Sequence, residues 1–159
     1  MLKQQRLRQA LLEQVPVLTR NPDTLALKLG EIHIVSTLAP SLCFEYRYPL
    51  IVTLTDLSAA TAAAILDNVT VVMLAWLREN QPDLLSSADK RQSGFTCLRA
   101  DSGDSCSLLF TLQLTERVLV TEQEGAAHVT HLPEPPPPED VAAPHEVYLD
   151  GELISSWTE

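Results

Sequence analysis

Glycine is scarce in this chain, with five residues among 159. The sequence has no G-x-G-x-x-G run, no P-loop and no G-x-S-x-G elbow. Each of these motifs needs glycine where the backbone turns sharply or approaches a phosphate closely. Their absence removes the common nucleotide-binding and α/β-hydrolase classes from consideration. We expect no enzyme activity, no catalytic residues and no cofactor.

Cysteine is also rare, and its pattern excludes two further classes. The three cysteines, Cys43, Cys97 and Cys106, are odd in number and show no C-x-x-C spacing. A disulfide framework is therefore not expected, and a reducing cytoplasm fits the chain. All three lie in apolar, alternating surroundings, which favours buried and inert thiols.

Long hydrophobic runs are missing as well. The most apolar stretch, "VTVVMLAWL", is far too short to span a bilayer. The first residues, "MLKQQRLRQALLEQ", carry charge and glutamine where a signal peptide needs an apolar segment. The formal net charge of −10 argues against nucleic-acid recognition. We expect a protein that is neither exported by a visible signal nor embedded in a membrane.

A metal site has one weak candidate, the sequence "HVTH" with His128 and His131. On a strand, residues three apart point to opposite faces, so these two rings could not hold one ion together. Ordinary surface histidines are the favoured interpretation, and no metal is expected.

Hydrophobic periodicity predicts two helices and several strands. Residues 2–14 and 58–80 repeat apolar side chains at helical spacing, the second with Ser58 or Thr61 as its cap. Residues 24–29 and 31–38 alternate with period two around Gly30, as a hairpin or a bent strand. Residues 43–56 form the next strand, which Pro49 places at a sheet edge or at a bulge.

A long strand over residues 106–122 follows, and "EQEG" turns it back into a partner strand. Its apolar face is interrupted by Glu116, with Arg117 beside it, where the strand either bends or projects from the domain. A solvated strand end is the favoured interpretation of Glu116 and Arg117, because exposed ion pairs contribute little. An ion pair between subunits is the alternative, so both are candidate interface residues.

These elements predict an α+β fold, with helices packed on a largely antiparallel or mixed sheet. Residues 1–132 form the domain, with 11 Lys and Arg against 14 Asp and Glu. Residues 133–144, half of them proline, form a linker of roughly 35 Å if they adopt polyproline II. Residues 145–159 form a terminal hairpin arm. From residue 133 onward the chain has seven acids and no Lys or Arg.

The hairpin is predicted by Asp150-Gly151, the strongest short signal for a two-residue loop. This register sets Tyr148 opposite Leu153 and Val147 opposite Ile154, with Trp157 on the Tyr148 face. Because a lone two-stranded hairpin is marginal in water, these five residues are candidates for an interface. A disordered acidic tail is the alternative, and an SH3-type ligand is disfavoured by the acidic flanks.

Several segments resemble a known family, in the same order along the chain: "AWLRENQPDLL" (75–85), "LTERVLV" (114–120), "EPPPPE" (134–139) and "LDGELISSW" (149–157). "LRQAL", "NPD" and "STLAPSLCFEYRY" are similar too. The chain resembles, essentially end to end, the tail completion protein R (GpR) family of temperate contractile-tailed phages of the peduovirus group. The middle, around "SAATAAAILDN" and "CLRADSGDS", matches least.

The resemblance implies a structural role in finishing the phage tail, and no catalytic residues are carried over. It implies a tail terminator, a homohexameric ring at the head-proximal end of the tube, assembled in the bacterial cytoplasm. Expected partners are copies of itself, the tube and sheath proteins, and a neck or head–tail connector protein. Two alternatives are kept: an adaptor of the neck or baseplate that binds through its arm, and a small cytoplasmic enzyme.

Overall fold

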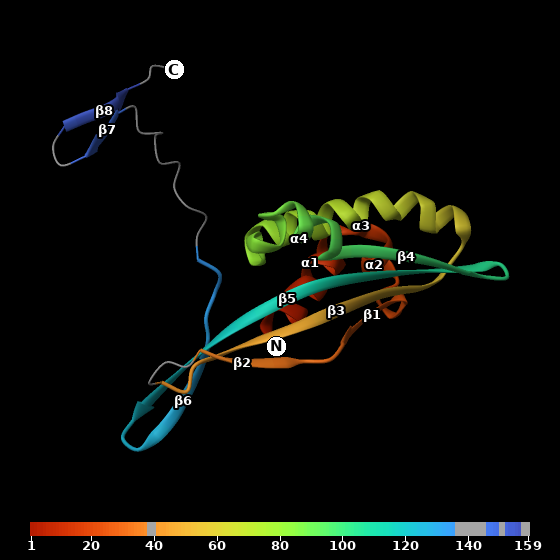
Figure 1. Ribbon diagram of the computed structural model, residues 1–159. Coiled ribbons are helices and arrows are strands. Elements are labelled where there is room, and N and C mark those ends of the chain that lie inside the picture. Colours follow the sequence, from red (N-terminus) through yellow and green to blue (C-terminus); the bar gives the residue numbers. More distant parts are fainter. Residues whose placement is uncertain (38–40, 136–145, 150–151, 157–159) are drawn as a thin grey trace.

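The computed structural model describes residues 1–37, 41–135, 146–149 and 152–156, the last two segments as backbone only (Figure 1). Its main sheet has six antiparallel strands in the described part of the chain, and a separate pair of strands follows. The strands are β1 (Leu25–Leu29), β2 (His33–Ser36), β3 (Phe44–Leu57), β4 (Phe95–Ser102), β5 (Ser105–Gln123), β6 (Ala126–His131), β7 (Glu146–Leu149) and β8 (Glu152–Ser156). The predicted α+β class is confirmed.

Four α-helices and two short 3₁₀ turns accompany the sheet over the described residues. They are α1 (Leu2–Gln14), α2 (Pro16–Arg20), η1 (Pro22–Thr24), α3 (Ala59–Asn80), η2 (Pro82–Leu85) and α4 (Ala88–Ser93). Figure 1 shows α1, α2 and α3 gathered on one side of the sheet. The boundaries of α1 match the prediction, and α3 begins one residue after its predicted cap.

The cap of α3 is Ser58, whose side chain accepts a hydrogen bond from the Thr61 N–H at 3.1 Å. This satisfies one of the N–H groups that the first helical turn leaves without a partner. One face of α3 then enters the core through Ile65, Val69, Val72, Met73, Trp76 and Leu77, as the spacing predicts. By length and composition alone α3 could cross a membrane, a property that it shares with core helices of other proteins.

The core lies between this helical layer and the inward face of β3 and β5. Alternate residues of both strands are buried there: Tyr48, Leu50, Val52 and Leu54 on β3, and Cys106, Leu108, Phe110, Leu112, Leu114 and Val118 on β5. Full burial of one leucine stabilises the fold by roughly 1.5–3 kcal/mol. The period-two pattern in the sequence therefore identified the buried face of both strands correctly.

The segment around Gly30 is a bent strand and not a hairpin, since β1 and β2 both pair with β3. The edge position predicted from Pro49 is wrong, because β5 flanks β3 on its other side along nearly its whole length. Gly30 donates its N–H to the Pro49 carbonyl at 2.9 Å. The side of Pro49 that lacks a donor therefore faces the gap between β1 and β2, where no ladder partner is needed. The register shift in β3 lies instead between Leu54 and Leu57.

The sheet continues beyond the helices, as predicted for the long strand. The distal part of β5 leaves β4 and pairs with β6 through a two-residue turn at Glu124 and Gly125, both with positive φ. We call this projecting part, residues 33–36, 44–46 and 118–131, the overhang. Figure 1 shows its β5–β6 end extending beyond the helical layer.

Candidate interaction site

Glu116 marks the point on β5 where the helical cover of the sheet ends. It accepts the N–H groups of Leu2 at 3.3 Å and Lys3 at 3.1 Å, which are the first two residues of α1. Helix α1 has no side-chain cap of its own, since Met1 occupies the N-cap position. A carboxylate from a distant strand therefore caps the helix and complements its dipole.

Two further groups complete the surroundings of this carboxylate. The Tyr48 hydroxyl donates to it at 2.5 Å, and the His131 Nδ1 lies 3.1 Å away. Glu116 is buried, with 4% of its surface exposed, so its predicted solvated position is wrong. The alternative, an ion pair with another subunit, stays a prediction. The Glu116 carboxylate can be buried because four local groups compensate for the hydration that it loses.

The electrostatics of this cluster follow from the same contacts. Burial raises the pKa of Glu116, but hydrogen bonds from Tyr48, Lys3 and Leu2 and the N-terminal ammonium outweigh it, so the pKa is lowered overall. Burial, together with Glu116, raises the pKa of Tyr48 far above its ordinary value. Tyr48 is therefore a neutral donor to an ionised carboxylate at any physiological pH.

A second group of contacts adjoins the first through the side chain of Lys3. Its ammonium donates to the Gln81 Oε1 and to the Glu134 Oε1, both at 2.6 Å. Gln81 also accepts the Thr115 N–H at 3.0 Å, in the gap where β4 has ended and β6 has not begun. We call Lys3, Gln81, Glu116, His131 and Glu134 the junction cluster. A cavity of about 160 Å³ lies at this cluster.

The junction cluster fixes the first residues after the sheet to the domain. Glu134 belongs to the segment predicted as a free linker, yet it holds Lys3 at the start of α1. Sequence reasoning did not identify the partners of Glu116, which are Leu2, Lys3, Tyr48 and His131. It also did not identify Gln81 and Glu134 as partners of the Lys3 ammonium. The available signal was an acid on an apolar strand face in a chain whose first helix has no capping residue.

Arg117 points away from this cluster and is exposed, which confirms the solvated position predicted for it. Its backbone pairs with Glu45 on β3, and its carbonyl accepts the Leu132 N–H at 2.9 Å. No ion pair of Arg117 is found among residues 1–37 and 41–135. An interface role stays a prediction for both residues, and of the two Arg117 is the exposed one.

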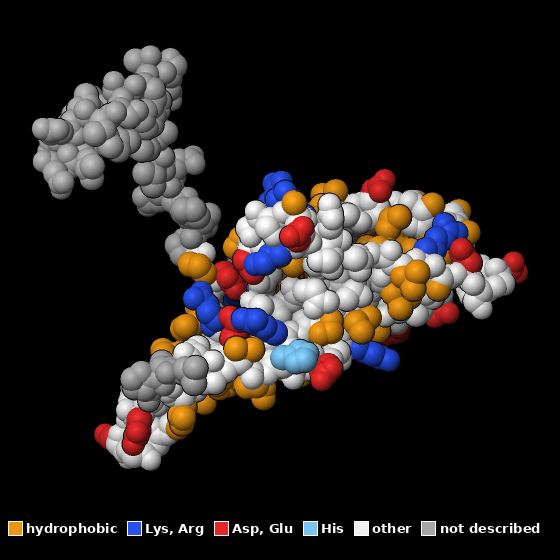
Figure 2. Space-filling model, viewed as in Figure 1, with side chains coloured by type: hydrophobic (Ala, Val, Ile, Leu, Met, Phe, Trp, Pro, Cys, Tyr) orange, Lys and Arg blue, Asp and Glu red, His pale blue; other side chains and the backbone are white. Residues whose placement is uncertain are grey.

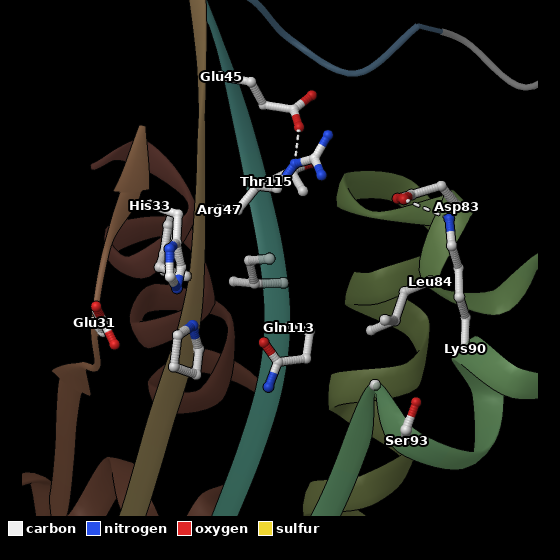
Figure 3. Close-up of a pocket in the computed structure, with 14 residues that line it drawn as sticks. Glu31, His33, Glu45, Arg47, Asp83, Leu84, Lys90, Ser93, Gln113 and Thr115 are labelled. Atoms are coloured by element: carbon white, nitrogen blue, oxygen red, sulfur yellow. Dashed lines mark hydrogen bonds and ion pairs between the residues drawn. The ribbon is translucent and has the colours of Figure 1, made fainter. Parts of the chain in front are cut away.

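A groove of about 660 Å³ lies on the other face of the sheet (Figure 3). Four of its charged side chains pair with one another: Arg47 with Glu45 at 2.7 Å, and Lys90 with Asp83 at 3.3 Å. Figure 3 shows Glu31 and His33 on one side and the pair from η2 and α4 on the other. Glu31 lines the groove without an ion pair in the described part of the chain. No nucleophile among the described lining residues is hydrogen-bonded to a base.

The overhang has an apolar face whose side chains are partly or mostly exposed. Its residues on the helix-facing side of the sheet include Ile34, Phe44, Tyr46, Val120, Ala127 and Val129, which we call the platform. Ile34 is 70% exposed and Val129 60% exposed. Figure 2 shows hydrophobic side chains along this projection and acidic ones at its tip. Exposed apolar surface of this kind makes the platform a candidate interaction site.

The terminal hairpin is present as the strands β7 and β8. Tyr148 lies opposite Leu153, as predicted. The predicted pairing of Val147 with Ile154 is wrong, because Val147 lies opposite Ser155 and the register shifts between Val147 and Tyr148. An extra residue in β8 is accommodated there as a bulge. Trp157 lies outside the described residues, and no contact tests these five as interface residues.

The cysteines differ from expectation in their burial. Cys106 is buried, but Cys43 is half-buried and Cys97 is exposed, so the prediction that all three are buried is wrong. Cys97 lies on β4, a strand at the edge of the sheet, where side chains on either face can remain exposed.

The two histidines lie on opposite faces of β6, as the spacing predicts. His131 faces Glu116, whereas His128 pairs in register with Thr121 on the other face. Among residues 1–37 and 41–135 we find no cluster of three or more potential metal ligands.

Two comparisons with known proteins identify the same family. The family model described as P2 phage tail completion protein R (GpR) matches residues 1–135. Tail completion protein R of Escherichia phage P2 is 46% identical over 160 residues, covering 100% of both chains. No solved structure matches the chain. The matched range ends directly after Glu134, the last residue of the junction cluster.

Proposed function

Because the chain belongs to the P2 phage tail completion protein R (GpR) family, we propose that it is the tail terminator, the protein that closes the head-proximal end of the tail tube. Membership of this family makes the chain a structural component of the phage tail and not an enzyme. The position at the head-proximal end, after assembly in the host cytoplasm, is part of the proposal.

The observation that supports a terminator most directly is the overhang. A subunit of a closed ring needs two different surfaces that meet head to tail around the symmetry axis. The overhang offers an apolar surface that its own helices do not reach, with Ile34 and Val129 both mostly exposed. We propose a homohexamer, the ring order that the family resemblance suggests.

The arm supplies the second support. Residues 136–145 lie outside the described residues, and the sequence from 133 onward is rich in proline and acid. We propose that the segment carries the β7–β8 hairpin to a neighbouring subunit or to a protein of the tube, sheath or neck. Strand addition to an open sheet edge would satisfy the backbone groups of the hairpin. The candidate contacts on it are Val147, Tyr148, Leu153, Ile154 and Trp157.

One alternative function deserves a test because the same arm supports it. An adaptor in the neck or baseplate would use the hairpin to hold a different protein, and its copies need not contact each other. A terminator is present in a fixed number of copies at one end of the tube, whereas a baseplate adaptor is found at the other end.

The deciding experiment is electron microscopy of purified tails that carry a tagged copy of this protein, with quantitation of copies per tail. We expect a single labelled ring at the head-proximal end, with six copies. A label at the baseplate, or scattered along the tube, would refute the terminator. A label in the neck with fewer than a ring of copies would favour the adaptor.

A further inference from the structure

We propose that the β7–β8 hairpin of one copy adds to the open edge of β4 in the next copy around the ring. The inference rests on the proposed function, because it takes the arm as the element that joins copies at the end of a tail. It goes beyond that function by naming the strand that receives the arm. That strand runs from Phe95 to Ser102 and is described over its whole length.

The backbone of β4 has one side that faces away from the sheet. β4 is the last strand in the order β1-β3-β5-β4, and β5 is its one strand neighbour in the described part of the chain (Figure 1). The Gln113 N–H donates to the Gly94 carbonyl at 2.9 Å, one position before Phe95 pairs with Leu112. Antiparallel residues exchange hydrogen bonds at every second position, so residues 96, 98, 100 and 102 bond to β5. The N–H and C=O groups of residues 95, 97, 99 and 101 therefore point outward.

These outward groups are left open by the rest of the domain. Among residues 1–37 and 41–135 we find no hydrogen bond from another element to them. The side chains from Thr96 to Ser102 are all exposed as well. Four N–H and four C=O groups in a row are a template for pairing with a further strand.

The chain covers comparable backbone groups at other places in the sheet. On the outer side of β1, the Leu25 carbonyl accepts from Arg8 at 3.0 Å and the Leu27 carbonyl accepts from Gln4 at 3.2 Å. The gap in the ladder of β5 is filled by the Gln81 amide. Proteins cover sheet edges in this way against unwanted pairing. The uncovered edge of β4 therefore favours a partner strand at this position.

The two edges of the overhang fit the hairpin less well. β2 has four residues, so two of them point outward. On β6 the same alternation leaves three outward residues, at positions 127, 129 and 131. Residues 118–131 contain two acids and no Lys or Arg, and residues 146–156 contain three acids and no Lys or Arg. Like charges therefore disfavour docking of the hairpin on β6.

The surroundings of β4 have the opposite charge balance. α4 and β4 together contain three basic residues against two acids: Lys90, Arg91 and Arg99, with Asp89 and Asp101. Arg91 is exposed and donates to the Leu85 carbonyl at 2.9 Å, and we find no ion pair for it among the described residues. Leu98 is 63% exposed on β4 and offers apolar surface beside the edge. An acidic hairpin with apolar residues complements both features.

The length of the linker favours β4 of a neighbouring copy. Glu134 is bound to Lys3 beside Glu116, so the linker begins near this point of β5. The first outward residue, Phe95, lies opposite Leu112, four positions or roughly 13 Å along β5 from Glu116. Residues 136–145 include four prolines and would span about 31 Å as polyproline II. A spacer of this composition extends more easily than it folds back, which disfavours the chain's own β4.

This contact is heterologous, because the hairpin of each copy meets a different element in the next. Heterologous contacts close into a ring when the rotation between copies divides a full turn. The competing positions for the hairpin are the chain's own β4 and a different tail protein.

A proline substitution tests the edge directly. Cys97→Pro removes an N–H that points away from β5, whereas Cys97→Ser at the same position keeps it. We expect the two variants to melt at similar temperatures. The yield of completed tails should be roughly fivefold or more lower for Cys97→Pro, because the added strand loses a hydrogen bond and meets the proline ring.

Two outcomes of this comparison would overturn the proposal. Equal yields would show that no strand pairs with this edge. A much lower melting temperature for Cys97→Pro would show that the Cys97 N–H bonds within the domain, so that the outward assignment is wrong.

Cross-linking in assembled tails identifies the occupant. Val147→Cys and Ser155→Cys are made separately in the full-length chain with native Cys97, and tails are treated with a short bismaleimide before peptide mapping. The two positions lie opposite each other on β7 and β8, so one of them approaches β4 whichever strand pairs with it. We expect a ladder of multimers in steps of one subunit, with links between Cys97 and the new cysteine of another copy. Adding Cys97→Ser should remove the ladder.

The mapped links separate the competing positions. A link within one chain would place the hairpin on its own sheet, and a link to another tail protein would give the hairpin a different partner. Either result, or no link from either position in complete tails that contain the variant, would overturn the proposal. Absence of the protein from finished tails would instead refute the proposed function.

Discussion

Lys3 and Glu134 are 131 positions apart in sequence, and the Lys3 ammonium lies 2.6 Å from the Glu134 carboxylate. The two side chains are 8% and 18% exposed, so solvent screens the pair only partly. The pair joins the first turn of α1 to the chain just after β6. We infer from this pair that residues 133–135 act with the domain, and we expect the arm to begin after Pro135.

Two truncations test this boundary. Ending the chain after Leu132 removes Glu134 and leaves the buried Lys3 ammonium with Gln81 as its remaining hydrogen-bond partner among the described residues. We expect this form to be less stable than residues 1–135 by roughly 1–3 kcal/mol, because a charged hydrogen bond is lost at a buried cation. Urea unfolding of both forms measures the difference. Full-length Glu134→Gln should reproduce most of the loss, and equal stabilities of the two truncated forms would contradict the boundary.

Glu116→Gln tests the distant cap of α1. The amide keeps the size of the side chain but cannot accept four contacts as an anion does, so we expect a loss of roughly 1–3 kcal/mol at neutral pH. Urea unfolding monitored by circular dichroism gives this value. Glu122→Gln, exposed on the same strand, is the matched control and should be neutral.

The same substitution should change how stability depends on acid. The folded-state pKa of Glu116 lies below its ordinary value of 4.5, so its contribution is present above pH 4.5 and is lost as the pH falls through the folded-state pKa. Wild-type stability should therefore fall more steeply than that of Glu116→Gln over this range. Parallel curves for the two proteins would show that Glu116 is not the group responsible.

Local pattern was sufficient to predict most of the fold. The boundaries of α1, the Ser58 cap and the buried face of β5 follow from hydrophobic spacing and capping, which are properties of neighbouring residues. Pro49 was misplaced because its missing donor matters only on one side of the strand. The sequence does not show that β1 ends and β2 begins there.

The junction cluster could not be predicted in the same way. Glu116 stood out as an acid on an apolar face, and solvent exposure is the ordinary explanation of such a residue. Two of its donors, the backbone N–H groups of Leu2 and Lys3, are more than 110 positions away in the sequence. Nothing in a single sequence specifies which distant helix end a strand will approach. A long-range contact of this kind depends on topology, and only the folded chain reveals it.

The cysteines should differ in accessibility. We expect a thiol reagent such as DTNB to modify Cys97 in the native protein and to reach Cys106 only after unfolding, because Cys97 is exposed and Cys106 buried. Cys97→Ser should change stability by less than about 0.5 kcal/mol, and Cys106→Ser should cost roughly 1–2 kcal/mol. Rapid native modification of Cys106 would contradict the core packing.

We also expect chelators to leave tail assembly unchanged.

The arm gives the last prediction. A chain that ends after Pro135 keeps the junction cluster and the entire six-stranded sheet, so we expect it to fold with nearly unchanged melting. It should nevertheless fail to complete tails, because a two-stranded hairpin such as β7–β8 is marginal alone and gains its stability from the surface it binds. Complementation of a phage that lacks the gene measures completion, and thermal unfolding measures folding.

Single substitutions locate the effect within the arm. Trp157→Ala should weaken binding by about 2 kcal/mol if the tryptophan is an interface anchor, and Ser155→Ala on the same segment is the matched control. Raised salt should reduce assembly if the seven acids of residues 133–159 face a basic surface. A truncated chain that still completes tails would refute the role of the arm. A truncated chain that melts far earlier would show that the hairpin packs on its own domain, since the junction cluster is intact in that form.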